Sequence, residues 1–133
     1  MRDIKFRGLN TRGKWVYGSL VQTTSYCVQH SKTWIVETAF GNGGWFNVQR
    51  KQYVRPATVG EITNCRDKNE REIYEGDIIS ELSGRIYKVE YLYDTFGAYD
   101  KDGNGMRLSY YCPQCEVIGN IYENPELLGG YQQ

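Results

Sequence analysis

The fold class of this chain is decided by its clearest strand pattern, Arg85-Ile86-Tyr87-Lys88-Val89-Glu90-Tyr91-Leu92-Tyr93. Polar and apolar side chains interleave along it, as they do on a strand with one face toward a core and the other toward solvent. The alternation slips once, and a slip of this kind is typical of a β-bulge. The segment therefore predicts a half-buried strand.

Shorter strand patterns flank this segment on both sides. They cover residues 4–8, 15–21, 26–28, 33–38, 45–48, 58–63, 72–80, 106–111 and 116–122. The chain has 12 Tyr, 15 Gly and only 3 Pro, a composition typical of strands joined by turns. The one helical signal is Asn124-Pro125-Glu126, with a capping residue and a proline at the first helical position. We predict an all-β fold, a single-domain mixed β-barrel or sandwich of about nine or ten short strands with one short C-terminal helical turn.

The 133 residues fit one domain, and their charge is unevenly distributed. Residues 1–56 hold nine basic and two acidic side chains, whereas residues 57–133 hold seven and 14, so the formal net charge is zero. We expect a single domain over 1–133, with a basic N-terminal β-subdomain over about 1–56 and an acidic barrel-like part over about 57–130. This uneven charge favours an interpretation in which the two halves, or two subunits, attract each other. The alternative is that the basic first half faces a nucleic acid.

The sequence predicts a cytoplasmic protein that does not enter a membrane. No apolar run approaches the roughly 20 residues that cross a bilayer. The N-terminus begins Met1-Arg2-Asp3, which is charged and lacks the apolar stretch of a signal peptide.

Two cysteine pairs raise the alternative of a metal site. Cys112 and Cys115 form a CxxC pair, and Cys27 and His30 form a CxxH pair, which together have the composition of a Cys₃His zinc site. The 81 residues between the pairs far exceed the spacing in a small zinc module. We therefore expect no cofactor and a tight turn at the CxxC pair, with zinc as the alternative.

Other candidate chemistry is weak. Residues 100–105, Asp-Lys-Asp-Gly-Asn-Gly, match the start of a calcium-binding loop, but Tyr111 stands where the bidentate acid belongs. The same residues suit a hairpin turn, which is our prediction. The chain has a single His, and no acid, base and nucleophile converge in any pattern, so we expect no enzyme.

A nucleic-acid interface is the second functional hypothesis. It consists of the basic residues Lys5, Arg7, Arg12 and Lys14, which are interleaved with Phe6, Trp15 and Tyr17. Basic and aromatic residues on β-strands are used by surfaces that bind single strands. The same aromatic residues also suit a core.

The sequence resembles the YopX family of phage and prophage proteins in three places. These are residues 2–8 with 15–18, residues 58–60 with 67–69 and 73–79, and residues 116–128. The resemblance implies a β-rich fold, a phage or prophage origin in a bacterial host cell, and no assigned activity or catalytic residue. The family usually has Gly after Asp67-Lys68-Asn69, where this chain has Glu70. That turn is therefore expected to use a left-handed Asn69 or a longer loop.

These observations lead to a first functional hypothesis. We expect a phage or prophage accessory protein that acts by binding or assembly and not by catalysis. Its expected partners are further copies of itself in a homo-oligomer, and a phage or host protein. A nucleic-acid-binding module is the alternative.

Overall fold

The structure is a computed structural model that describes residues 2, 4–23, 32–40 and 46–131. The chain divides into two compact units, Met1–Glu61 and Ile62–Gln133. The expectation of one domain over 1–133 stays a prediction. The predicted strand at residues 26–28 lies outside the described residues.

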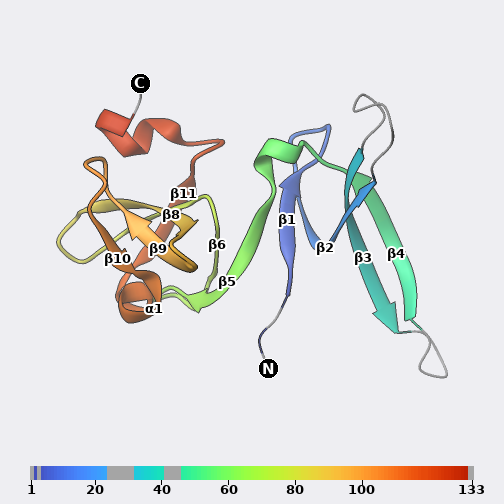
Figure 1. Ribbon diagram of the computed structural model, residues 1–133, viewed down its shortest axis with the longest axis horizontal. Coiled ribbons are helices and arrows are strands. Elements are labelled where there is room, and N and C mark those ends of the chain that lie inside the picture. Colours follow the sequence, from blue (N-terminus) through green and yellow to red (C-terminus); the bar gives the residue numbers. More distant parts are fainter. Residues whose placement is uncertain (1, 3, 24–31, 41–45, 132–133) are drawn as a thin grey trace. The chain divides into compact units, whose positions relative to one another are not determined.

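The all-β prediction is confirmed (Figure 1). The described part of the chain contains eleven strands: β1 (Phe6–Leu9), β2 (Trp15–Thr23), β3 (Lys32–Phe40), β4 (Phe46–Tyr53), β5 (Gly60–Arg66), β6 (Glu72–Tyr74), β7 (Asp77–Ser80), β8 (Ile86–Leu92), β9 (Thr95–Tyr99), β10 (Gly105–Arg107) and β11 (Glu116–Asn120). Every pairing between them is antiparallel. Within the described segments, no helix has the length and apolar character needed to span a membrane.

In the first unit, β1 to β4 form a meander whose neighbours in sequence are neighbours in the sheet. β1 also pairs on its other edge with the start of β5, where Phe6 lies opposite Glu61. On one face of this sheet Val16, Ile35 and Val54 form a buried core. That core is completed by Phe6, Leu20 and Val59, which are packed against it.

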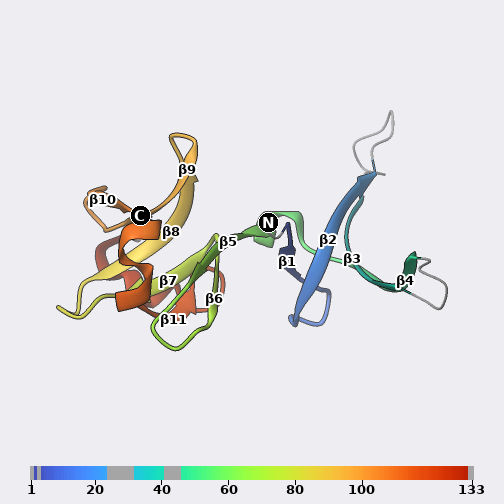
Figure 2. The ribbon, with the colours of Figure 1, turned by 90° about the horizontal axis from the view of Figure 1, so that it is seen from below.

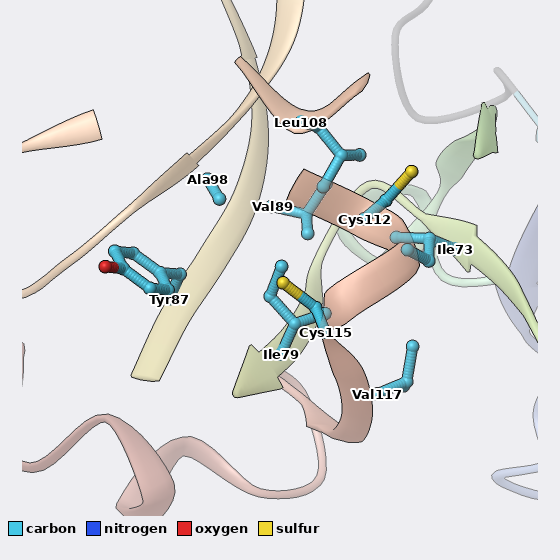
Figure 3. Packing of buried hydrophobic residues seen from close by; sticks show 9 residues of the cluster. All are labelled: Ile73, Ile79, Tyr87, Val89, Ala98, Leu108, Cys112, Cys115 and Val117. Carbon is cyan, nitrogen blue, oxygen red and sulfur yellow. The ribbon is translucent and has the colours of Figure 1, made fainter. Parts of the chain in front are cut away.

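The second unit contains a five-stranded sheet in the order β10-β9-β8-β7-β11 and the pairing of the later part of β5 with β6. Nine buried side chains form its core: Ile73, Ile79, Tyr87, Val89, Ala98, Leu108, Cys112, Cys115 and Val117 (Figure 3). The bulge expected in the strand pattern at residues 85–93 is wrong, since β8 pairs with both neighbours in continuous register. Tyr87 and Val89 supply the core face, while Ile86 lies on the other face and lines a hollow with Leu127.

The predicted strand at residues 106–111 is also wrong beyond its first residues. β10 ends at Arg107, and the chain continues as the helical turn α1 (Leu108–Tyr111) and the 3₁₀ turn η4 (Cys112–Gln114). Leu108 is completely buried, and burial of this side chain favours the helical turn. The C-terminal helical turn is confirmed as the first part of the 3₁₀ segment η5 (Pro125–Tyr131), which is interrupted at Gly129. A further short 3₁₀ turn, η3 (Pro56–Thr58), precedes β5.

Three five-residue hairpin turns share one hydrogen-bonding pattern. They occupy residues 10–14, 67–71 and 100–104, and each begins with Asn or Asp. The first side chain's Oδ1 accepts hydrogen bonds of 2.9–3.0 Å from the N–H groups of the third and fifth residues. The fourth residue has a positive φ in every case: Gly13 (76°), Glu70 (66°) and Gly103 (84°). The prediction of a hairpin turn at residues 100–105 is confirmed.

Glu70 corrects the expectation that Asn69 or a longer loop would absorb the missing glycine. Glu70 itself takes the left-handed conformation, which costs about 1–2 kcal/mol for a residue with a Cβ. We expect Glu70→Gly to stabilise the second unit by about 0.5–1 kcal/mol, because the relieved strain exceeds the added entropy of the unfolded chain. Urea denaturation measures this change. Gly103→Glu is the matched reverse substitution and should be destabilising, and a loss of stability in Glu70→Gly would contradict the assignment.

Candidate nucleic-acid interface

The face of the first unit opposite its core carries aromatic and basic side chains. Successive residues of a strand alternate between faces, so β3 places Ile35 in the core and Lys32 and Trp34 on the other side. Residues that pair across neighbouring strands lie on the same face of a sheet. Val21 of β2 and Tyr53 of β4 both pair with Trp34, so they belong to this face as well. β2 and β3 lie side by side in both views (Figures 1 and 2).

We call this surface the aromatic-basic face and define it by six residues. They are Tyr17, Val21, Lys32, Trp34, Lys51 and Tyr53. The exposed fractions of Tyr17, Val21 and Tyr53 are 42%, 42% and 46%, so large apolar groups on this face meet solvent.

A ring pair with two cations lies at the centre of the face. The centroids of Trp34 and Tyr53 are 3.7 Å apart, with their planes tilted by 33°. The Lys51 Nζ lies 4.3 Å from the Trp34 ring centroid, and the Lys32 Nζ lies 5.7 Å from that of Tyr53. Both distances are those of cation–π contacts. The arrangement presents flat π-surfaces and positive charge together.

The acidic residues on the described strands of the first unit belong to the opposite face. Glu37 lies two residues after Ile35 on β3, so its side chain is on the core face. Glu61 pairs with Phe6, whose side chain also packs on the core face. Each has a basic partner, since Glu37 is 3.9 Å from Arg50 and Glu61 is 3.9 Å from Arg2. With nine basic and three acidic residues in 1–61, this unit has a formal charge of +6. Among the residues of the described strands of this unit, no acid therefore shares the side of the sheet that carries Lys32 and Lys51.

One end of the face is hollowed. A depression of about 450 Å³ is lined by Tyr17, Ser19, Val36 and Lys5, together with Ile4, Gly18 and Glu37. Lys5 precedes β1 and brings a further basic side chain to this hollow. Because Glu37 also lines it, this hollow contains both a basic and an acidic side chain.

The structure separates the four basic residues that the sequence grouped as a nucleic-acid site. Arg7 is only 4% exposed, and its guanidinium carbon lies 4.4 Å from the centroid of the Trp15 ring. Arg12 and Lys14 lie in the exposed turn at residues 10–14, where their N–H groups bond to Asn10. Of the four, Lys5 lines the hollow beside Tyr17.

Sequence reasoning missed the central residues of the face. Lys32 with Trp34 and Lys51 with Tyr53 each have a basic and an aromatic residue two positions apart, which places both on one side of a strand. This spacing was the available signal. Only the pairing of β3 with β4 brings the two pairs together.

The predicted zinc ligands fall into two groups. Cys27 and His30 lie outside the described residues. Cys112 and Cys115 are buried in the core of the second unit, and the Cys115 Sγ donates to the Tyr111 carbonyl oxygen at 3.2 Å. Burial raises the pKa of both thiols, that of Cys112 to about 12. Among the described residues, no three Cys, His, Asp or Glu side chains are arranged to hold a metal ion.

The fold and this face define an open-sheet, antiparallel β-protein with an exposed aromatic and basic surface on one unit. The chain belongs to the YopX family, because the family model described as YopX protein matches residues 5–129. The resemblance noted in the sequence is thereby confirmed. No curated protein matches the chain.

Among solved structures, the chain is similar to protein EF1440 from Enterococcus faecalis. The TM-score is 0.59 at 23% sequence identity, and the match covers 96% of this chain and 99% of that one. At this level of identity the likeness establishes a shared fold.

Proposed function

We propose that this protein acts by binding and not by catalysis, and that its first unit holds single-stranded nucleic acid on the aromatic-basic face. The observation that carries the proposal is the Trp34–Tyr53 ring pair with Lys51 and Lys32 over its rings. Proteins that bind single strands combine aromatic platforms for bases with basic groups for phosphates.

The geometry favours a single strand over a duplex. Bases in a duplex are stacked on each other, whereas the bases of a single strand can stack on exposed rings. Each ring of the pair already holds an ammonium group near its centre. A base that stacks on one of these rings has to displace the lysine from it, and the displaced ammonium group then lies within reach of the phosphate backbone.

Family membership supports the wider setting of the proposal. A phage or prophage accessory role in a bacterial cytoplasm is what the resemblance implies, and binding a single strand is compatible with such a role. The homo-oligomer and the phage or host protein partner stay predictions.

Fluorescence anisotropy with a labelled single-stranded oligonucleotide tests the proposal. We expect Trp34→Ala or Tyr53→Ala to weaken binding by roughly 5- to 150-fold, because stacking contributes about 1–3 kcal/mol per base. Replacing Lys32 and Lys51 by Gln should reduce the slope of log affinity against log salt by about 1.4, since each phosphate contact contributes about 0.7.

The exposed turn supplies the matched control. Arg12→Ala with Lys14→Ala removes two charges from residues 10–14 and leaves the aromatic-basic face intact, so affinity should fall far less than in the ring variants. Circular dichroism confirms that each variant is folded. Unchanged affinity in both ring variants, or no binding at low salt, would refute the proposal.

A further inference from the structure

Two cysteines of the second unit, Cys65 and Cys112, line the same hollow. Cys65 on β5 is partly buried, and Cys112 at the start of η4 is 6% exposed. Both line a depression of about 490 Å³, together with Asn64, Ser109 and Pro113. Cys65 packs against the core cluster that contains Cys112, and, after burial, the neighbouring Cys65 thiol contributes to the raised pKa of Cys112.

A bulge in β5 brings Cys65 into this position. β5 pairs with β6 at Ile62 with Tyr74 and at Arg66 with Glu72, so three β5 residues lie opposite Ile73 alone. Asn64, immediately before Cys65, has a φ of 64°. Bulges of this kind redirect a side chain from its regular place on the strand.

We propose that Cys65 and Cys112 are a thiol pair that closes to a disulfide when the protein meets a peroxide. Both side chains line one depression, and Cys65 packs against the cluster that holds Cys112, so a disulfide with its S–S bond of about 2 Å would join side chains of the same small region. Because the depression is open to solvent, a small oxidant can reach the pair.

The reaction balances in two steps. The Cys65 thiol attacks one peroxide oxygen, an S–O bond forms, the O–O bond breaks, and a sulfenic acid and one water result. The Cys112 thiol then attacks the Cys65 sulfur, the S–S bond forms, the S–O bond breaks, and a second water leaves. The two sulfurs together lose two electrons, which reduce the peroxide.

The environments of the two sulfurs set this order. Burial, followed by the neighbouring Cys65 thiol, raises the pKa of Cys112 to about 12, so Cys112 is protonated at neutral pH. The thiolate is the reactive form of cysteine, and the more accessible Cys65 is therefore oxidised first. A protonated resolving thiol reacts slowly, so the disulfide should form over minutes and not in a rapid catalytic cycle.

The CxxC pair is not the reacting pair. Cys115 is completely buried, and its thiol is engaged with the Tyr111 carbonyl. Figure 3 shows the Cys112 and Cys115 side chains pointing to different sides of the turn that joins them.

Peroxide treatment of the full chain followed by digestion without reductant tests the proposal. We expect a disulfide-linked peptide pair that contains Cys65 and Cys112 and lacks two hydrogens relative to its parts. The melting temperature should rise by about 10 °C and return to its initial value after dithiothreitol, because the cross-link closes a long loop.

Two variants complete the design. Cys65→Ser should leave Cys112 as a free thiol after peroxide and abolish the rise in melting temperature, whereas Cys27→Ser should leave both results unchanged. The proposal is overturned if the wild-type chain yields cross-links through Cys27 or Cys115 instead. It is equally overturned if peroxide oxidises Cys65 to higher acids while Cys112 stays free.

Discussion

Replacing Asp67 by Ala is expected to destabilise the second unit by about 4 kcal/mol. The Asp67 carboxylate is 2% exposed and accepts three backbone hydrogen bonds of 2.9 Å, from Asn69, Arg71 and Val117. Its loss leaves these donors without their acceptor. The Val117 donor is buried, and a buried unsatisfied donor costs about 1–3 kcal/mol, whereas the part-buried donors of Asn69 and Arg71 contribute less. The Val117 bond also joins the turn to β11, so the effect extends beyond one hairpin.

The same carboxylate makes stability depend on pH. Burial by itself raises the pKa of Asp67, but the three N–H donors and the charge of Arg71 lower it to a net value below the ordinary 3.8. A carboxyl with a lowered folded-state pKa contributes stability that is fully present above its unfolded-state pKa. That stability is lost as the pH falls from about 4 through the folded-state value. The Asp67→Ala variant should show a correspondingly smaller loss of stability with acid.

Urea denaturation at neutral and acid pH measures both effects, and Asp100→Ala is the matched control. Asp100 makes the same two bonds within its own turn, to Asp102 and Asn104. In the described structure it has no counterpart of the Val117 bond, so we expect a loss of only about 1 kcal/mol. Equal losses in the two variants would contradict the role of Asp67 in joining the turn to β11.

Leu108→Ala is expected to lower the free energy of unfolding by about 3 kcal/mol, which is the second-largest of the effects that we predict. Leu108 is completely buried in the second core, and truncating a buried leucine removes apolar contacts and leaves a cavity. Tyr110, two residues along the same helical turn, is 71% exposed and contacts Arg107 at the surface. Tyr110→Ala should therefore cost less than about 0.5 kcal/mol.

The pair of variants also tests the helical turn itself. A strand through residues 106–111 would place Leu108 and Tyr110 on the same face, so both truncations would then have similar costs. Chemical denaturation of the two variants distinguishes a helical turn at these residues from a strand. A loss in Tyr110→Ala close to that in Leu108→Ala would argue against α1.

The strands and turns were largely predictable because their signals are local. The pattern at residues 85–93 places β8, and Asp100 to Gly105 predict a turn from residues that are adjacent in sequence. α1 was not predictable in this way. Its segment has a strand-like local pattern, and the burial of Leu108 depends on contacts with residues far away in the chain, such as Ile73 and Val89.

The candidate site was predictable only in part. The predicted interface on the basic and aromatic N-terminal hairpin included Arg7, but Arg7 is buried against Trp15. The exposed pairs, Lys32 with Trp34 and Lys51 with Tyr53, are separated by a segment whose length and register the sequence does not specify. The two pairs lie together only because β3 pairs with β4, and this pairing joins residues that are far apart in the sequence.

The pairing of β11 with β7 affects the order in which the chain can assemble during synthesis. All the described strands of the first unit are present once Glu61 has left the ribosome, since the start of β5 completes its pairing with β1. β7 instead has one edge unpaired until residues 116–120 emerge, an interval of a few seconds at about 5–20 residues per second. A nascent chain therefore exposes a finished aromatic-basic face before its second unit can close.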